Sequence, residues 1–155
     1  MSNIYTGPGQ GARVTQIALF KQIWIRSNKR SFVSGLHLRE FQNTELFLSC
    51  FPHILAKGQN QYPRFKYYAG NVRLMTVGEH SLWDNGTIEA RLKYEIEVPT
   101  ADWKKVEALR DELIKLYKKH FPSTFGGILN YRYSPEEEIS IISKLNKQYF
   151  DSLNK

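Results

Sequence analysis

Four side chains in the middle of the chain could together cleave a phosphodiester bond. His53 follows an apolar run, Asn71 opens a second apolar run, and His80 precedes Asp84 by four residues. A neutral imidazole can remove a proton from water near neutral pH, and we assign this role to His53. On a helix, His80 and Asp84 project from the same face, so their nitrogen and oxygen atoms can bind a divalent cation. The pattern predicts a metal-dependent nuclease.

The residues around these four fit the same chemistry. The Asn71 amide can hydrogen-bond the backbone of the preceding loop, which would hold His53 in position. A bound cation would neutralise charge on the scissile phosphate and stabilise the departing 3′ oxygen. Arginine can clamp phosphates through paired hydrogen bonds and lysine as a point charge. The candidate phosphate-binding residues are Lys57, Arg64 and Arg73.

Each candidate also has an ordinary structural interpretation. A histidine at a strand end is commonly a surface or core residue, Asn71 fits a turn, and His80 with Asp84 fits a surface pair on a helix. Cys50 either packs in the core, which we favour, or assists a softer metal. An aromatic run at 62–68 could stack on bases or pack on the strands. The order and context of the residues together favour the catalytic interpretation.

Four short runs form a joint pattern. Residues 52–58 are Pro-His-Ile-Leu-Ala-Lys-Gly, 62–65 are Tyr-Pro-Arg-Phe, 71–75 are Asn-Val-Arg-Leu-Met, and 78–87 are Gly-Glu-His-Ser-Leu-Trp-Asp-Asn-Gly-Thr. This pattern resembles the HNH (ββα-metal) nuclease superfamily, and especially its small bacteriophage proteins. The joint pattern is specific, whereas a bare series of His, Asn and His is not.

The resemblance implies a role for each of the four side chains. By it, His53 is the general base, Asn71 the structural asparagine, and His80 and Asp84 the metal ligands. Many HNH nucleases carry a further ligand directly before the base, where this chain has Pro52. With two protein ligands we expect Mg²⁺, which keeps several waters and shares substrate oxygens, with Mn²⁺, Ni²⁺ and Zn²⁺ as alternatives.

Hydrophobic periodicity predicts the elements that must position these residues. Apolar runs predict short strands at residues 31–35, 46–51 and 72–77. Helical spacing predicts helices near residues 79–83, 89–94, 102–117 and 135–149. Residues 14–25 fit a helix, although 23–25 fit a strand equally well. Strands early and helices late favour an α+β fold, with a ββα-metal motif on a small sheet and amphipathic helices after it.

Length and composition indicate one folded domain. The chain has 155 residues, within the ~100–200 residues of a usual domain. Its 41% hydrophobic and 14% aromatic residues supply a core and exclude wholesale disorder. We predict a flexible arm over residues 1–12 and a single domain over 13–155. In that domain the core motif lies at about 45–95 and a helical part at 100–155.

Cysteine content and hydropathy bear on the cellular location. The single cysteine excludes an internal disulfide framework and a four-cysteine zinc site. No window approaches ~18 uninterrupted apolar residues, and the first residues lack the pattern of a signal peptide. We therefore expect a soluble, cytoplasmic protein without membrane contact. The resemblance places it in a bacterial host cell.

The net charge of +7 predicts a polyanionic partner. Residues 1–60 hold seven Lys and Arg against two acidic residues, and phosphate contacts dominate nucleic-acid affinity. We expect DNA as the partner, and a homodimer if both strands are cut, by two-fold symmetry. Two alternatives stay open. One is a catalytically inactive HNH-fold protein that binds nucleic acid, and the other is a phage-type protein that binds a host factor.

Overall fold

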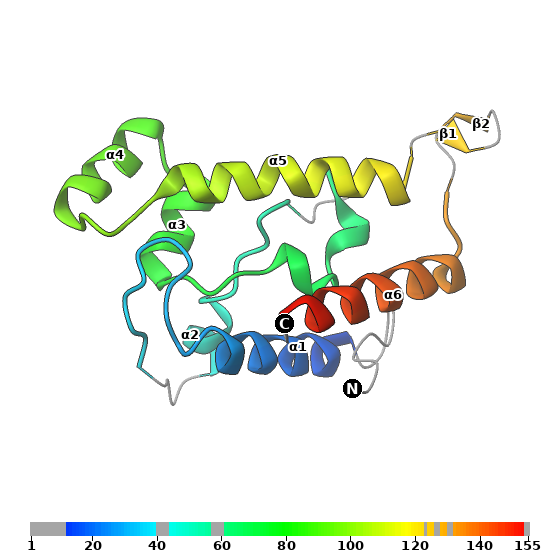
Figure 1. Cartoon of the computed structure of the whole chain (residues 1–155), viewed down its shortest axis with the longest axis horizontal. Helices are drawn as coiled ribbons and strands as arrows, with labels where there is room; N and C mark the ends of the chain where they lie inside the picture. The colour runs from blue at the N-terminus through cyan, green and yellow to red at the C-terminus, as the bar shows by residue number, and fades with distance from the viewer. Residues whose placement is uncertain are drawn as a thin grey trace. The chain divides into compact units, whose positions relative to one another are not determined.

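The chain is built from helices joined by irregular segments (Figure 1). The computed structural model describes residues 12–39, 44–56, 61–122, 124–125, 128–129 and 132–153. The α-helices are α1 (Ala12–Arg26), α2 (Thr44–Leu48), α3 (Val77–Asn85), α4 (Ile88–Glu97), α5 (Trp103–His120) and α6 (Pro135–Leu153). Two short 3₁₀ helices are η1 (Pro63–Phe65) and η2 (Ala69–Asn71).

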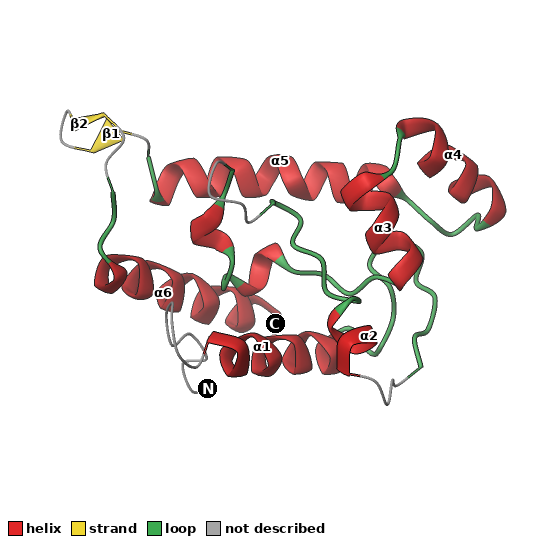
Figure 2. Ribbon diagram, turned by 180° about the vertical axis from the view of Figure 1, so that it is seen from behind, coloured by secondary structure: helices red, strands yellow, loops and turns green. Residues whose placement is uncertain are grey.

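The predicted α+β fold is wrong, because 64% of the residues that the structure describes are helical. In the described part of the chain, the only strands are the two-residue β1 (Thr124–Phe125) and β2 (Ile128–Leu129), which pair antiparallel. Figure 2 shows helices and loops in all other described segments. The predicted ββα-metal motif on a small sheet is therefore absent from the described residues.

Each of the three predicted strands has a different structure. Residues 46–51 enter helix α2 and then a turn, since a short apolar run fits a helix as well as a strand. Residues 31–35 form a turn in which the Ser31 hydroxyl accepts two backbone hydrogen bonds. Local bonds of this kind compete with a strand. Residues 72–76 are irregular, with a single isolated bridge at Val72.

The predicted helices are confirmed. Residues 14–25 belong to α1, and 23–25 are helical with the rest. A capping box opens α6, because the Ser134 hydroxyl accepts from the Glu137 N–H at 3.2 Å and the Glu137 carboxylate accepts from the Ser134 N–H at 3.4 Å. None of the described helices is both long and apolar enough to cross a membrane.

The chain folds into two compact units made of interleaved segments. The α3 unit comprises Phe20–Ile54 and Val72–Arg110, and the α6 unit comprises Met1–Leu19, Leu55–Asn71 and Asp111–Lys155. Helices α1 and α5 each contribute to both units. The single domain over residues 13–155 stays a prediction. The predicted arm lies outside the described residues, except for Ala12, at which α1 begins.

Stacked aromatic rings form the core of the α3 unit. The rings of Trp83 and Trp103 lie parallel with centroids 6.4 Å apart, and those of Phe20 and Phe51 stack at 4.6 Å. All four side chains are buried. Large aromatic side chains contribute much of the apolar burial of a core, and the contact between Trp83 and Trp103 packs α3 on the first residue of α5.

The core of the α6 unit includes the aromatic run at 62–68, which contains η1. Phe65 is fully buried, and its ring packs on that of Tyr117 with centroids 4.8 Å apart. The buried Asn146 amide accepts from the Ala69 N–H at 2.7 Å and donates to the Tyr67 carbonyl at 3.0 Å. Packing thus accounts for the buried part of the aromatic run.

Candidate active site

The two segments 50–53 and 72–75 bring His53 next to the chain that leads into α3. The Met75 N–H donates to the Cys50 carbonyl at 2.8 Å, and His53 forms an antiparallel bridge with Val72. Both pairings belong to one antiparallel register, because Cys50 lies three residues before His53 and Met75 lies three residues after Val72. Two such contacts do not make a strand, but they fix the backbone that carries His53.

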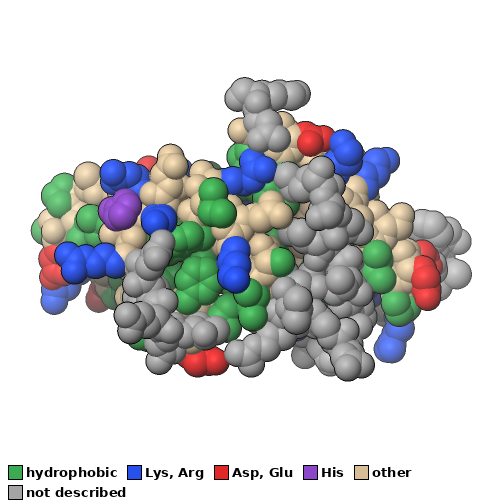
Figure 3. Space-filling view, turned by 90° about the horizontal axis from the view of Figure 1, so that it is seen from below, with side chains coloured by type: hydrophobic (Ala, Val, Ile, Leu, Met, Phe, Trp, Pro, Cys, Tyr) green, Lys and Arg blue, Asp and Glu red, His purple; other side chains and the backbone are tan. Residues whose placement is uncertain are grey.

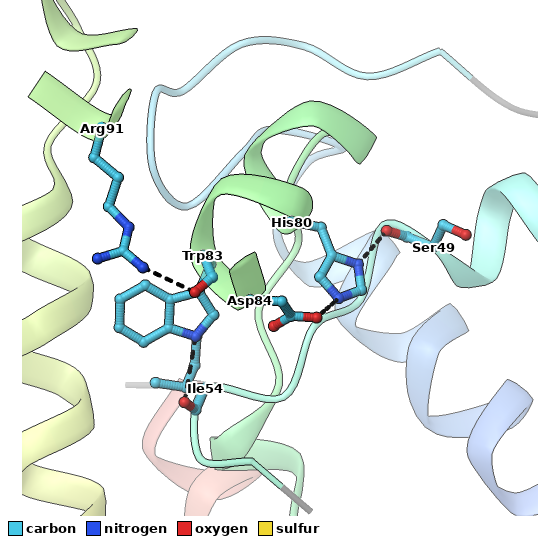
Figure 4. A network of polar contacts seen from close by, with 6 residues as sticks. All are labelled: Ser49, Ile54, His80, Trp83, Asp84 and Arg91. Carbon is cyan, nitrogen blue, oxygen red and sulfur yellow. Dashed lines mark hydrogen bonds and ion pairs between the residues drawn. The ribbon is translucent and has the colours of Figure 1, made fainter. Parts of the chain in front are cut away.

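The backbone after His53 is held by Trp83 of α3. The indole Nε1 donates to the Ile54 carbonyl at 3.3 Å (Figure 4). The His53 ring meets the Phe20 ring edge to face, with centroids 6.5 Å apart, and the residue is half-buried. An imidazole with this partial exposure can exchange protons with water.

His80 has an oxygen acceptor beside each ring nitrogen (Figure 4). Its Nδ1 lies 2.6 Å from the Ser49 carbonyl oxygen, and its Nε2 lies 2.8 Å from Asp84 Oδ2. The His80 and Asp84 side chains are 27% and 48% exposed, so ions from solvent can reach both. The spacing of four residues on α3 therefore brings the two predicted ligands together.

These contacts determine where the His80 ring can carry protons. A carbonyl oxygen only accepts, so the contact with Ser49 requires a proton on Nδ1. In the neutral ring, Nε2 then directs its lone pair at the Asp84 carboxylate. Two acceptors at 2.8 Å repel each other unless a positive charge lies between them. Either the ring is an imidazolium, or a cation binds both side chains.

A divalent cation fits this pair. Mg²⁺ binds oxygen at about 2.0–2.1 Å in an octahedron, which puts neighbouring ligands roughly 2.9 Å apart. The Nε2 to Oδ2 distance of 2.8 Å is close to that value. A histidine that binds a metal through one nitrogen usually donates from the other to a carbonyl or carboxylate, as Nδ1 of His80 does to Ser49.

No third protein ligand is found among the residues that the structure describes. They contain no group of three or more His, Cys, Asp and Glu side chains that could hold a metal ion. Cys50 is fully buried in the core, and burial, together with the nearby Glu79 carboxylate, raises the pKa of its thiol to about 11. A cation here would complete its coordination with water and substrate oxygen.

A buried carboxylate, which the sequence analysis missed, anchors the start of α3. Glu79 is fully buried and accepts from the hydroxyls of Ser31 at 2.5 Å, Ser34 at 2.6 Å and Tyr94 at 2.5 Å. With Thr76 it also forms a capping box. Threonine three residues before glutamate is the sequence signal that could have revealed the cap.

The far end of α3 is capped by an arginine from α4. Arg91 donates to the carbonyl oxygens of Leu82 and Trp83, both at 2.9 Å. Its guanidinium also lies over the Trp83 ring, 5.1 Å from the centroid. The last carbonyls of a helix lack partners inside the helix, so Arg91 fixes the turn that carries Asp84. Trp83 itself faces the core, with 8% exposure.

Asn71 is fully buried in the α6 unit and binds the backbone at two places. Its Oδ1 accepts from the Leu55 N–H at 2.7 Å, and its Nδ2 donates to the carbonyls of Leu55 at 3.1 Å and Phe65 at 3.3 Å. The amide thus closes the chain segment between residues 55 and 71. Its contribution to catalysis stays a prediction.

The three predicted phosphate-binding residues have different surroundings. Arg64 lies 3.9 Å from the Glu138 carboxylate and 5.0 Å from the centroid of the Tyr133 ring. Arg73 donates to the Val72 carbonyl at 3.0 Å, and Lys57 lies outside the described residues. On the face drawn in Figure 3, lysine and arginine side chains lie among hydrophobic and polar ones. Phosphate binding by these residues stays a prediction.

Comparisons with known proteins show no relative of this chain. No protein-family model matches it, and no curated protein or solved structure is significantly similar to it. The function is therefore inferred from the residues of the α3 unit and their contacts.

Proposed function

We propose that this protein is a divalent-metal-dependent DNA endonuclease, in which His80 and Asp84 bind the cation and His53 activates water. The observation that carries the proposal is the geometry of His80. Its Nδ1 faces the Ser49 carbonyl while its Nε2 faces the Asp84 carboxylate, and a cation bound by both side chains is one of the two states that this arrangement allows, the other being an imidazolium. The sequence pattern that resembles HNH nucleases points to the same assignment, although the described residues lack the ββα sheet of that superfamily, and Mg²⁺ is the first choice of ion.

The residues of this chain would divide the reaction between them. His80 and Asp84 would hold a divalent cation, which would neutralise charge on the scissile phosphate and stabilise the leaving 3′ oxygen. His53 accepts a proton from the water whose oxygen forms the new bond to phosphorus as the bond to the 3′ oxygen breaks. The backbone bonds at Cys50 and Ile54 keep His53 in place. DNA as partner, a cytoplasmic location and a homodimer for double-strand cutting belong to this proposal.

A plasmid assay tests the catalytic roles. Supercoiled DNA is incubated with the protein and Mg²⁺, Mn²⁺, Ni²⁺ or Zn²⁺, beside EDTA. We expect metal-dependent nicking that falls by about 10²-fold or more in His53→Ala, the usual contribution of a general base, and also in His80→Ala. His37→Ala is the matched control, because His37 is an exposed histidine of the same unit. Nicking in EDTA, or at the full rate in His53→Ala, would contradict the proposal.

A binding assay tests the ion site without relying on cleavage. Mn²⁺ bound to the protein is measured by electron paramagnetic resonance for wild type, His80→Gln and Asp84→Asn. Removing one of two protein ligands should weaken binding at least 10-fold, in the range known for changes around metal sites. Asp102→Asn removes an exposed acidic residue of the same unit and should leave binding unchanged. Equal Mn²⁺ affinities in all four proteins would show that His80 and Asp84 do not form a metal site.

A non-catalytic DNA-binding protein is the second candidate. Two observations favour it: Pro52 stands where many HNH nucleases have a ligand, and the described residues supply no third ligand. This candidate predicts duplex binding whose affinity falls steeply with salt, with no nicking in any metal. Absence of any DNA affinity would instead favour a protein that binds a host factor.

A further inference from the structure

Helix α4 carries a line of exposed apolar side chains. Ile88, Leu92 and Ile96 are 71%, 55% and 80% exposed. Residues four apart lie on one face of a helix, so the three form a continuous stripe, and none of the residues of α4 is buried. Water contact with an aligned apolar stripe is unfavourable, which indicates a surface that another helix can cover.

The opposite face of α4 attaches the helix to its own unit. Arg91 donates to the last carbonyls of α3, and the Tyr94 hydroxyl donates to the buried Glu79 carboxylate at 2.5 Å. These contacts fix the rotation of α4 about its axis. The stripe therefore faces outward because of how α4 is held, and it is not free to turn inward.

We propose that the stripe binds α4 of a second copy of this chain, with the two helices antiparallel about a two-fold axis at Leu92. A two-fold interface uses the same patch on both copies. Ile88 then packs on the partner's Ile96, and Leu92 packs on the partner's Leu92. The three apolar residues are spaced symmetrically around Leu92, so the pairing leaves none of them unmatched.

Charges beside the stripe favour this partner and this orientation. Glu89 and Lys93 are exposed and lie along one edge of the stripe, the edge away from Arg91. In an antiparallel pair this flank faces the same flank of the second helix, so Glu89 meets the partner's Lys93, and the contact occurs twice. A parallel pair would instead set this flank against the side of Arg91, whose guanidinium is bound to α3. This flank carries one acidic and one basic residue. A partner with charges of a single sign would therefore be repelled by one of them.

The proposal does not depend on the metal site, and it gives the expected homodimer a defined surface. One helix pair buries less than the ~800 Å² per partner of a standard interface. We therefore expect a dimer that forms reversibly as the protein concentration rises.

Sedimentation velocity of the metal-free protein over a series of concentrations tests the association. We expect the mass to rise from 18.1 kDa towards twice that value. Ile88→Glu should remain at the mass of one chain. Ile25→Glu is the matched control, because Ile25 is also 71% exposed but lies on α1, and it should associate as wild type does. A wild type that stays at 18.1 kDa at every concentration overturns the proposal and leaves the stripe to a different partner.

Charge reversal tests the pairing of the flanks. Glu89→Lys and Lys93→Glu each place like charges opposite one another, so both should weaken association. The double variant Glu89→Lys with Lys93→Glu restores opposite pairs and should recover it. No recovery in a double variant with the wild-type circular dichroism spectrum would contradict the antiparallel register.

Cysteine cross-linking distinguishes the two orientations. Antiparallel helices put residue 88 beside residue 96 of the partner, and about 12 Å along the axis from the partner's own residue 88. Ile88→Cys mixed with Ile96→Cys should therefore form a disulfide-linked dimer, while each variant alone should not. The native Cys50 is buried and does not compete. Self-linking of Ile88→Cys alone would indicate parallel helices and overturn the proposal.

Discussion

At the scale of single residues, one proton on His80 decides what the site can bind. The Ser49 carbonyl requires a proton on Nδ1, which leaves Nε2 as the nitrogen that faces Asp84. Metal binding needs that nitrogen unprotonated, whereas an ion pair needs it protonated. The two states exclude each other, so a cation bound through Nε2 replaces the direct ion pair with Asp84.

The tautomer of His80 is a direct prediction of this geometry. With Zn²⁺ bound, the side chain should carry its proton on Nδ1 and bind the ion through Nε2. Long-range ¹H–¹⁵N correlation spectra distinguish the two ring nitrogens, and His80→Gln identifies the signals. A zinc-bound ring with its proton on Nε2 would rule out the proposed coordination. His37, an exposed histidine of the same unit, serves as the reference and should not respond to Zn²⁺.

Asn71 should contribute strongly to stability. Asn71→Ala removes the partner of three backbone groups in a fully buried position, and a buried polar group left without a partner costs about 1–3 kcal/mol. We expect the free energy of unfolding to fall by roughly 2–4 kcal/mol, measured by urea denaturation. Asn85→Ala, at an exposed position, should change it by no more than about 0.5 kcal/mol. Equal values for the two variants would contradict the structure.

The Cys50 thiol should be unreactive in the native protein. It is buried, and its pKa is raised to about 11, mainly because burial disfavours the thiolate and secondarily because Glu79 is negative. Only the thiolate attacks alkylating reagents. Alkylation by iodoacetamide at neutral pH should therefore be slow and should accelerate in urea in parallel with unfolding. Rapid alkylation without urea would mean that the segment before His53 opens readily.

At the scale of elements, α3 depends on the carboxylate of Glu79. Glu79→Ala would leave the hydroxyls of Ser31, Ser34 and Tyr94 without their acceptor. We expect the free energy of unfolding to fall by at least about 3 kcal/mol, since several buried donors lose their partner. The matched control is Glu112→Ala, an exposed glutamate on α5, which should be nearly neutral. A small effect of Glu79→Ala in urea denaturation would show that α3 is held mainly by its tryptophan contacts.

The helices were predicted correctly because the sequence signals of a helix are local. The predicted strands were wrong because a strand depends on contacts with distant residues. Apolar spacing and a Ser-x-x-Glu cap suffice for α6. An apolar run as short as 46–51 carries no such information, and its first residues became helix α2. A strand also needs a partner that is fixed elsewhere in the chain. Residues 50–53 and 72–75 meet in one register, but too few of their backbone groups pair to form a strand.

Only the local part of the candidate site was predictable from the sequence. The contact between His80 and Asp84 follows from a spacing of four residues on a helix. The Ser49 carbonyl that orients His80 is a backbone atom, and any residue there would offer it. The hydroxyl groups around Glu79 come from residues 45, 48 and 15 positions away in sequence. Such contacts are set by packing, which periodicity does not describe.

At the scale of the whole molecule, the two units are tied together by chain connectivity. The chain passes between them at residues 19/20, 54/55, 71/72 and 110/111. The first and last of these passages lie inside α1 and α5. If one unit unfolded alone, α1 and α5 would each be half unfolded. Each would then have a new helix end whose backbone groups lack partners. We therefore expect the two units to unfold together, as the predicted single domain requires.

Two spectroscopic probes can test this expectation without any substitution. All three tryptophans, Trp24, Trp83 and Trp103, lie in the α3 unit, so their fluorescence reports on that unit. Far-ultraviolet circular dichroism reports on the helices of both units, including α6. Coincident urea transitions would establish a single cooperative domain. If circular dichroism showed a further transition at a different urea concentration, the α6 unit would unfold separately, and α1 and α5 would have to break at the boundary between units.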